Sequence, residues 1–245
     1  MLRHGLLILY ILFCNLLLAE GEKFIYQTKF RNLRVGNTQV NITPSIQNDV
    51  KKVILTINSS TNKIVDLVYK LRHFSTIIVN AADFSLITTT KKIQQGKYID
   101  SYTATVDYNL KQILYQNTKD INYKQLENQL ILPINGPVYD PFSIVYYLRN
   151  FNLHIGETYN FISYNKKKTR DIDLYVEKIE KLRTPYLTAD CFVVVPRHRG
   201  DGPLLKNQGE MKIWFTADSN QFPIKIQQKM THGIMELNLK DYVKK

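Results

Sequence analysis

The chain has 245 residues and a formal net charge of +12, with 33 Lys and Arg against 21 Asp and Glu. The basic residues are scattered, and the sequence contains no recognition helix or RNA-binding signature, so nucleic acid is excluded as the expected partner. The length is sufficient for one domain, although two would also fit.

Residues 1–21 have the three parts of a secretory signal peptide. Arg3 supplies the basic start, an apolar run covers residues 6–18, and a small-x-small site ends at Gly21. We therefore expect cleavage after Gly21, which leaves residues 22–245 as a single exported β-rich domain. A membrane span needs about 20 apolar residues, so an uncleaved anchor is the weaker alternative.

The two cysteines have different interpretations. Cys14 lies inside the apolar run, but Phe13 precedes it where a lipidation site needs a small residue. Removal of the signal leaves Cys191 alone, so no intramolecular disulfide can form and the fold must be held by its core. We interpret Cys191 as a small buried hydrophobe in a strand, because no nearby His or helix N-terminus would activate its thiol.

The first half of the exported chain has the alternating or briefly apolar pattern of β-strands. The expected strand segments are 24–26, a stretch after a turn or bulge at 35–38, 53–57, 84–93, 98–108, 113–115 and 121–123. Residues 59–73 change period and place four apolar residues at i, i+3, i+4 and i+7. These residues are Ile64, Leu67, Val68 and Leu71. The spacing predicts an amphipathic helix, capped by Ser59 or Ser60, that packs on a sheet.

A second helix is predicted after the break at residues 135–137. Asp140 is the expected N-cap and Pro141 the first helical residue, where the missing N–H costs nothing. Its apolar face would consist of Ile144, Tyr147, Leu148 and Phe151. The remaining segments read as strands, at 159–164, 172–179, 191–195, 211–216, 224–230 and 234–239.

Short turns between successive strands imply antiparallel pairing, because a parallel crossover needs a dozen or more residues. The strands are too many for one flat sheet. The expected fold class is therefore mainly β, a strongly curved antiparallel sheet or open barrel with two amphipathic helices.

The sequence contains no familiar catalytic or metal-binding constellation. A Gly-rich phosphate loop, a G-x-S-x-G elbow, an H-E-x-x-H helix and a Cys/His cluster are all absent from it. We therefore predict no catalytic residue, metal or cofactor, while a site assembled only in space stays open.

The segment with most chemical character is the polar loop at residues 196–203. Arg197 and Arg199 could clamp a phosphate or carboxylate, with Asp201 orienting one of them. Together with His198 they form our candidate anion-binding loop. The alternative is that the loop makes turns and its arginines are solvated.

Three aromatic residues are candidates for the lining of a pocket. Tyr146 and Tyr147 could place one ring in the core and one toward an opening at the mouth of a curved sheet, with Trp214 nearby. The alternative is core and rim packing. Trp214 should lie in a strand beside Phe215, with at least one of these two rings in the core.

Several blocks of the C-terminal half stand in a recognisable order and spacing. They are Asp140-Pro141-Phe142-Ser143, then residues 146–149, 153–159, 189–194, 213–218 and 222–226, and finally Gly233. This set resembles the bacterial envelope family called domain of unknown function 3108, and residues 21–26 are similar too, whereas residues 60–135 match poorly. The resemblance implies a secreted or periplasmic protein of a Gram-negative-type bacterium with a mostly antiparallel β-fold. It implies no activity.

We expect a non-enzymatic exported protein that binds an apolar or amphiphilic ligand or an envelope partner, in the periplasm or at the periphery of the outer membrane. The charge of +12 favours a lipid or anionic envelope component, with peripheral membrane contact. One alternative is an envelope enzyme acting on cell-wall or lipid substrates through residues 197–201. The other is a structural or assembly factor with neither ligand nor chemistry.

Overall fold

The computed structural model describes residues 21–47, 49–118, 129–199, 210–230 and 232–245. Residues 1–20 of the predicted signal, the predicted strand 121–123 and Asp201 of the candidate loop lie outside the described residues.

The described residues form fifteen strands and three short helical segments. The strands are β1 (Glu22–Phe30), β2 (Leu33–Gln47), β3 (Val50–Thr61), β4 (Leu71–Asn80), β5 (Leu86–Gln95), β6 (Tyr98–Asp107), β7 (Gln112–Asn117), β8 (Gln129–Pro133), β9 (Val138–Tyr139), β10 (Thr158–Asn165), β11 (Lys168–Arg183), β12 (Thr188–His198), β13 (Met211–Thr216), β14 (Pro223–Met230) and β15 (Gly233–Lys244). The helices are α1 (Lys63–Asp66), α2 (Pro141–Tyr147) and the 3-10 helix η2 (Leu148–Asn150).

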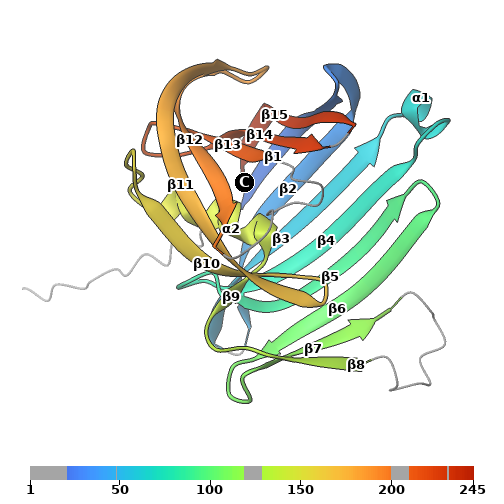
Figure 1. The fold of residues 1–245 in the computed structure, drawn as a ribbon, viewed down its shortest axis with the longest axis vertical. Coiled ribbons are helices and arrows are strands. Elements are labelled where there is room, and N and C mark those ends of the chain that lie inside the picture. The colour runs from blue at the N-terminus through green and yellow to red at the C-terminus, as the bar shows by residue number, and fades with distance from the viewer. Residues whose placement is uncertain (1–20, 48, 119–128, 200–209, 231) are drawn as a thin grey trace, which may run out of the picture.

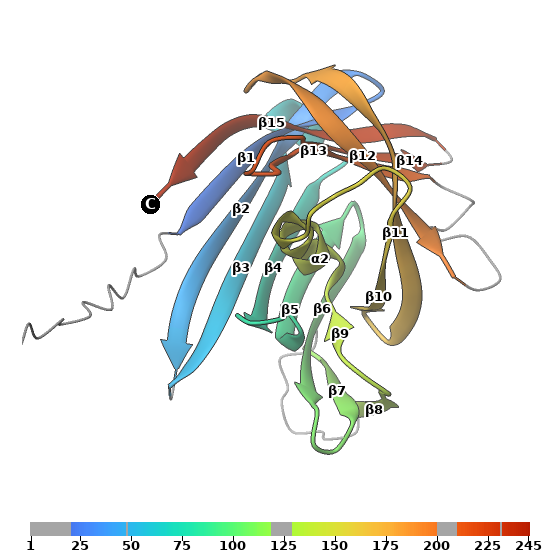
Figure 2. The same cartoon turned by 90° about the vertical axis from the view of Figure 1, so that its left-hand side faces the viewer.

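All described strands belong to one sheet, in the order β8-β7-β6-β5-β4-β3-β2-β1-β15-β14-β13-β12-β11-β10-β9. Every neighbouring pair is antiparallel except β9 with β10. The two ends of this order, β8 and β9, follow each other in the chain but are not paired, so the sheet curls without closing (Figures 1 and 2). The expectation of a mainly β, open and strongly curved antiparallel sheet is confirmed.

The helix α2 lies on the concave side of the curved sheet (Figure 2). Asp140 caps it by accepting a hydrogen bond of 2.9 Å from the backbone N–H of Phe142, and Pro141 is its first residue, as predicted. Its residues Ser143, Ile144, Val145 and Tyr146 are all buried. Because the sheet surrounds α2, burial is not confined to one stripe, and the helix is not the amphipathic element that we expected.

A buried ion pair joins α2 to the wall of the sheet. The Nζ of Lys91 on β5 lies 2.7 Å from the Oδ2 of Asp140, and both side chains are almost fully excluded from solvent. The ring of His73 on β4 packs against that of Phe142, with 5.7 Å between their centres. Burial, and then the charge of Lys91, lower the pKa of His73 to about 4, against the weaker opposing effect of Asp140.

The predicted helix over residues 59–73 is wrong. Strand β3 continues to Thr61 and β4 begins at Leu71, so the segment is a β-hairpin whose connection contains only the four-residue α1. The cap is Asn62 rather than Ser59 or Ser60, which are paired in the ladder with His73 and Arg72. The apolar spacing is real, but the connection projects beyond the end of the sheet, where there is no surface for it to cover.

The predicted buried placement of Cys191 is confirmed, since its side chain is fully buried in β12. Burial, with the nearby carboxylates, raises the pKa of its thiol to about 12. No helix in the described part of the chain is long and apolar enough to cross a membrane.

Candidate functional site

A cleft opens at the end of the sheet where β1 begins. It consists of two adjoining hollows of about 250 and 550 Å³. Residues after α2 form one side of the cleft and the turn between β13 and β14 forms the other. Arg149, Asn150 and Ser219 line both hollows, so we treat them as a single feature and call it the end cleft.

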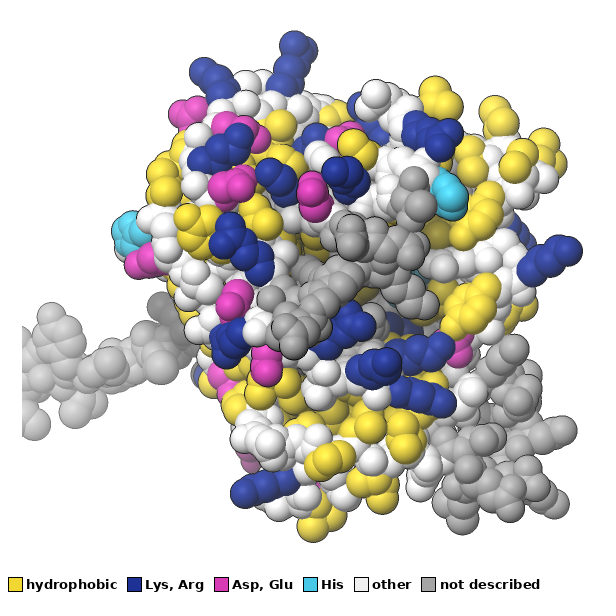
Figure 3. Space-filling model, viewed as in Figure 1, with side chains coloured by type: hydrophobic (Ala, Val, Ile, Leu, Met, Phe, Trp, Pro, Cys, Tyr) yellow, Lys and Arg dark blue, Asp and Glu magenta, His cyan; other side chains and the backbone are white. Residues whose placement is uncertain are grey.

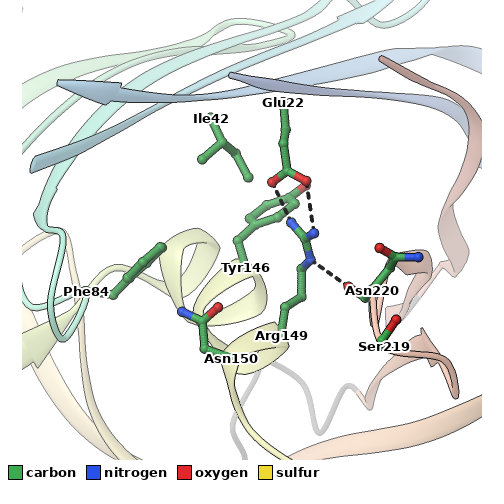
Figure 4. A pocket seen from close by; sticks show the side chains of 8 residues that line it. All are labelled: Glu22, Ile42, Phe84, Tyr146, Arg149, Asn150, Ser219 and Asn220. Carbon is green, nitrogen blue, oxygen red and sulfur yellow. Dashed lines mark hydrogen bonds and ion pairs between the residues drawn. The ribbon is translucent and has the colours of Figure 1, made fainter. Parts of the chain in front are cut away.

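Arg149 lines the smaller hollow, where its side chain points toward Glu22 (Figure 4). Its guanidinium group makes two hydrogen bonds, of 2.7 and 2.9 Å, to the two carboxylate oxygens of Glu22. Its Nε donates to the backbone carbonyl of Asn220 at 3.1 Å, and its Cζ lies 5.3 and 5.2 Å from the ring centres of Phe24 and Phe222. The charge of this arginine is therefore neutralised inside the protein.

Glu22 is held equally firmly. The hydroxyl of Tyr242 donates a hydrogen bond of 2.8 Å to the same carboxylate. Burial by itself would raise the pKa of Glu22, but the hydrogen bonds and charge of Arg149 outweigh it and the pKa is lowered. The pair is a structural clamp between β1 and η2.

The two sides of the cleft are tied together by Gln221. Its Nε2 donates to the backbone carbonyls of Arg149 and Phe151, at 3.0 and 2.7 Å. On the opposite side, the carboxylate of Asp218 accepts hydrogen bonds from the hydroxyl of Thr216 and from the backbone N–H groups of Asn220 and Gln221. Both sides of the end cleft are therefore held in place by hydrogen bonds within the protein.

The groups that remain for a ligand are mostly neutral and polar. Asn150, Asn152, His154 and Ser219 are exposed on the lips, and the rings of Phe151 and Phe192 are half-buried beneath them. Amides and hydroxyls both donate and accept hydrogen bonds. Among the described residues no group of three or more His, Cys, Asp or Glu side chains is placed to hold a metal ion.

The described residues of the predicted anion-binding loop lie elsewhere, at the end of β12 beside β11. Strand β12 extends to His198, which pairs with Ile172. The exposed guanidinium of Arg197 covers the ring of Tyr175 at 4.0 Å, and that of Arg199 makes hydrogen bonds of 2.6 and 2.9 Å to Asp173. The two arginines thus have partners within the protein, and anion binding by this loop stays a prediction.

Of the three predicted pocket aromatics, Tyr146 lines the end cleft and the other two do not. Tyr146 is buried against Tyr26, with 3.2 Å between the two hydroxyl oxygens, whereas Tyr147 stacks on Phe84 with 4.9 Å between ring centres. Trp214 is buried in β13 and its Nε1 donates to Glu180 at 2.7 Å. Phe215 is fully buried as well, so the expectation of at least one core ring in β13 is confirmed.

A family match that covers most of the chain shows which family the protein belongs to. The family described as "Protein of unknown function (DUF3108)" matches residues 25–240. The chain belongs to this family. No curated protein matches it. The resemblance seen in the C-terminal blocks is confirmed, and the match also includes residues 60–135.

One solved structure supports the fold of this DUF3108 chain. A β-barrel-like protein of the domain of unknown function DUF1849 from Brucella abortus has a TM-score of 0.62 and 10% identity, over 92% of this chain and 98% of that one. A candidate lipoprotein from Parabacteroides distasonis has a TM-score of 0.32 and 12% identity, over 91% and 95% of the two chains. The first shows a shared fold, and the second is too distant to carry an argument.

The end cleft was not predicted from the sequence of this family member. Asn150 and Asn152 read as residues that lead out of a helix, and the segment 217–221 reads as an ordinary turn. The one available signal was the polar character of both segments. Their proximity depends on Gln221, whose contacts with the chain after α2 cross about 70 residues of sequence.

Proposed function

We propose that this DUF3108 protein is a non-enzymatic envelope protein whose end cleft binds a neutral, hydroxyl-rich ligand such as a glycan chain. The observation that carries the proposal is that Arg149, the one Lys or Arg among the described residues of the lining, is already paired with Glu22 and so offers no free positive charge to an anionic ligand. Such a cleft favours a ligand that forms hydrogen bonds without bringing negative charge of its own.

The lining of the cleft also favours a ligand with both polar and apolar surface. The exposed amides of Asn150 and Asn152 lie at the lips, and Phe151 and Phe192 provide apolar surface below them. A sugar ring has polar edges and a less polar face, and it can use both kinds of group. The predicted export signal on residues 1–21 supports a location where envelope glycans are present.

The space inside the curve of the sheet is a poorer binding place for an amphiphilic ligand than the end cleft is for a polar one. That space contains α2, whose Ile144, Val145 and Tyr146 pack into the hydrophobic core. A lipid could enter only if α2 moved out, and the buried pair of Lys91 with Asp140 would then be separated. The end cleft needs no such movement.

Calorimetric titration with an oligomer of N-acetylglucosamine tests the proposal. The double variant Asn152→Ala/His154→Ala should weaken binding at least tenfold, because each lost hydrogen bond contributes roughly 1 kcal/mol. The control variant is Asn109→Ala, an exposed asparagine between β6 and β7 that does not line the cleft.

Equal weakening by the control variant, or no saturable binding of any neutral oligosaccharide by the wild-type protein, would overturn the proposal. Native mass spectrometry of protein taken from its own envelope is the companion measurement. An added mass that equals a lipid would instead favour the amphiphilic ligand.

A further inference from the structure

The connection between β3 and β4 exposes an unusual amount of apolar surface. The exposed fractions of Ile64, Leu67 and Val68 are 80%, 87% and 91%. Tyr69 is 49% exposed, and Leu33, the first residue of the adjoining β2, is 71% exposed. We call these five residues the apolar tip. Figure 3 shows hydrophobic side chains projecting at the upper right, where Figure 1 places α1.

The backbone under the apolar tip is well ordered by hydrogen bonds. Asn62 caps α1 by accepting a 2.9 Å hydrogen bond from the backbone N–H of Val65, and its own N–H donates to the carbonyl of Val35 at 2.9 Å. The N–H groups of Val68 and Tyr69 both donate to the carbonyl of Val65, at 3.0 and 2.8 Å. Since these polar groups are satisfied internally, the tip can present apolar side chains to a nonpolar phase without a large desolvation cost.

A charged anchor holds the base of the tip. Arg72 forms an ion pair with Asp66, and Thr61 accepts a hydrogen bond of 2.9 Å from the backbone N–H of Leu71. On the other side, the N–H of Gly96 donates to the carbonyl of Lys70 at 2.8 Å. The apolar residues are therefore presented by a fixed support rather than exposed by fraying.

Basic residues surround the tip. Arg31 and Arg34 are exposed beside Leu33, and Lys63 and Lys70 are exposed at the two ends of the α1 segment. Residues 31–34 and 61–72 together contain five Lys and Arg and one acidic residue, Asp66, which is paired with Arg72. A convex apolar surface with a basic rim is the combination that binds an anionic bilayer, by insertion of the apolar residues and attraction of the rim.

We infer that the apolar tip is a membrane-docking site for a bilayer that contains anionic lipid. A second copy of the chain is a poorer occupant, because face-to-face association would oppose two basic rims. The end cleft lies at the other end of β1, next to Glu22, whereas the tip adjoins the turn after Phe30. A strand rises about 3.3 Å per residue, so a docked protein would hold its cleft away from the lipid surface.

Co-sedimentation with vesicles tests this inference. One set contains phosphatidylethanolamine and phosphatidylglycerol, and the other contains phosphatidylcholine alone. Wild-type protein should bind the anionic set at least tenfold more tightly, and raised salt should weaken that binding. The variant Leu67→Ser/Val68→Ser should lose at least tenfold in affinity for the anionic vesicles while unfolding at the same denaturant concentration as wild type, because both side chains are exposed.

The matched control is Leu110→Ser/Ile155→Ser, which removes two exposed apolar side chains, 66% and 57% exposed, outside the tip. This variant should bind like wild type. A second test, Lys63→Gln/Lys70→Gln, should remove most of the preference for anionic lipid.

Three results would overturn the inference: equal binding by the tip variant and wild type, equal binding of wild type to both vesicle sets, or a wild-type dimer that the tip variant dissociates and that binds no vesicle. These vesicles contain no glycan, so failure here leaves the proposed role of the end cleft untouched.

Discussion

The segments around α1 and α2 are alike in sequence but occupy opposite environments. Each begins with an Asx N-cap, Asn62 or Asp140, and each has apolar residues at helical spacing. Ile64 in the first is 80% exposed, whereas Ile144 in the second is 2% exposed. The periodicity of a segment indicates an apolar surface, but the rest of the fold decides whether that surface meets protein, solvent or lipid.

Topology explains the difference. The α1 segment joins two neighbouring antiparallel strands and so stays at the end of their hairpin. The α2 segment follows β9 and precedes β10, which pair in parallel, so the chain has to return along the sheet and does so across its concave side (Figure 2).

The buried charge at the start of α2 should give the largest effect. Asp140→Ala removes a cap and leaves Lys91 buried without its partner, so we expect a loss of about 3–5 kcal/mol in the free energy of unfolding. Urea denaturation measures it. The double variant Lys91→Met/Asp140→Asn keeps an Asx cap without a buried charge and should recover most of the loss. A loss below about 1 kcal/mol for Asp140→Ala would show that the pair does not hold α2.

Matched isoleucine truncations compare the two segments directly. Ile144→Ala should cost about 2–5 kcal/mol because it leaves a cavity in the core. Ile64→Ala should change the free energy of unfolding by less than about 0.5 kcal/mol, since an exposed side chain loses little packing. Denaturant midpoints of the two variants provide the comparison, and similar losses at both positions would contradict it.

Acid should lower the free energy of unfolding through His73, which lies on β4 and packs against Phe142 of α2. The pKa of His73, about 4 in the folded protein, lies below its unfolded value near 6.5, so the unfolded chain binds more protons between these pH values. The free energy of unfolding should therefore fall by about 1–2 kcal/mol between pH 6.5 and pH 5. His73→Gln should remove most of that slope. A slope that the variant retains would assign the acid sensitivity to other groups.

A small and local effect is expected at the cap of α1. Asn62→Ala removes the hydrogen bond to the Val65 N–H, and caps of this kind contribute about 1 kcal/mol. Amide hydrogen exchange at Val68 and Tyr69 should accelerate, while the free energy of global unfolding should fall by no more than about 1 kcal/mol. If the tip needs its fixed support, the same variant should also bind anionic vesicles more weakly.

Much of the fold was predictable from short-range pattern. The strand at Met211–Thr216, the helix that begins at Pro141 with Asp140 as its cap, and the antiparallel open sheet all follow from alternation, capping residues and short connections. These features depend on neighbouring residues and can be read locally. The export signal on residues 1–21 stays a prediction.

The candidate sites were less predictable because they depend on contacts between distant segments. Arg149 belonged to a family-like block, but its partner Glu22 is 127 positions away. Arg197 and Arg199 attracted attention as a basic loop, yet on the neighbouring strand Tyr175 contacts Arg197 and Asp173 pairs with Arg199. A sequence window shows which groups are present, and it does not show which of them are already engaged.

The amino-acid pattern was enough to indicate the family, the β-rich class and two short apolar segments, although of their two Asx caps only Asp140 was predicted. The pairing of distant strands then places one segment inside the curve of the sheet and the other at its edge. A side chain is buried only where other parts of the chain cover it, and local sequence does not show which parts will do so. Ile64 and Ile144 carry the same side chain, and its contribution to stability depends on whether the strands paired around it enclose it or leave it in contact with solvent.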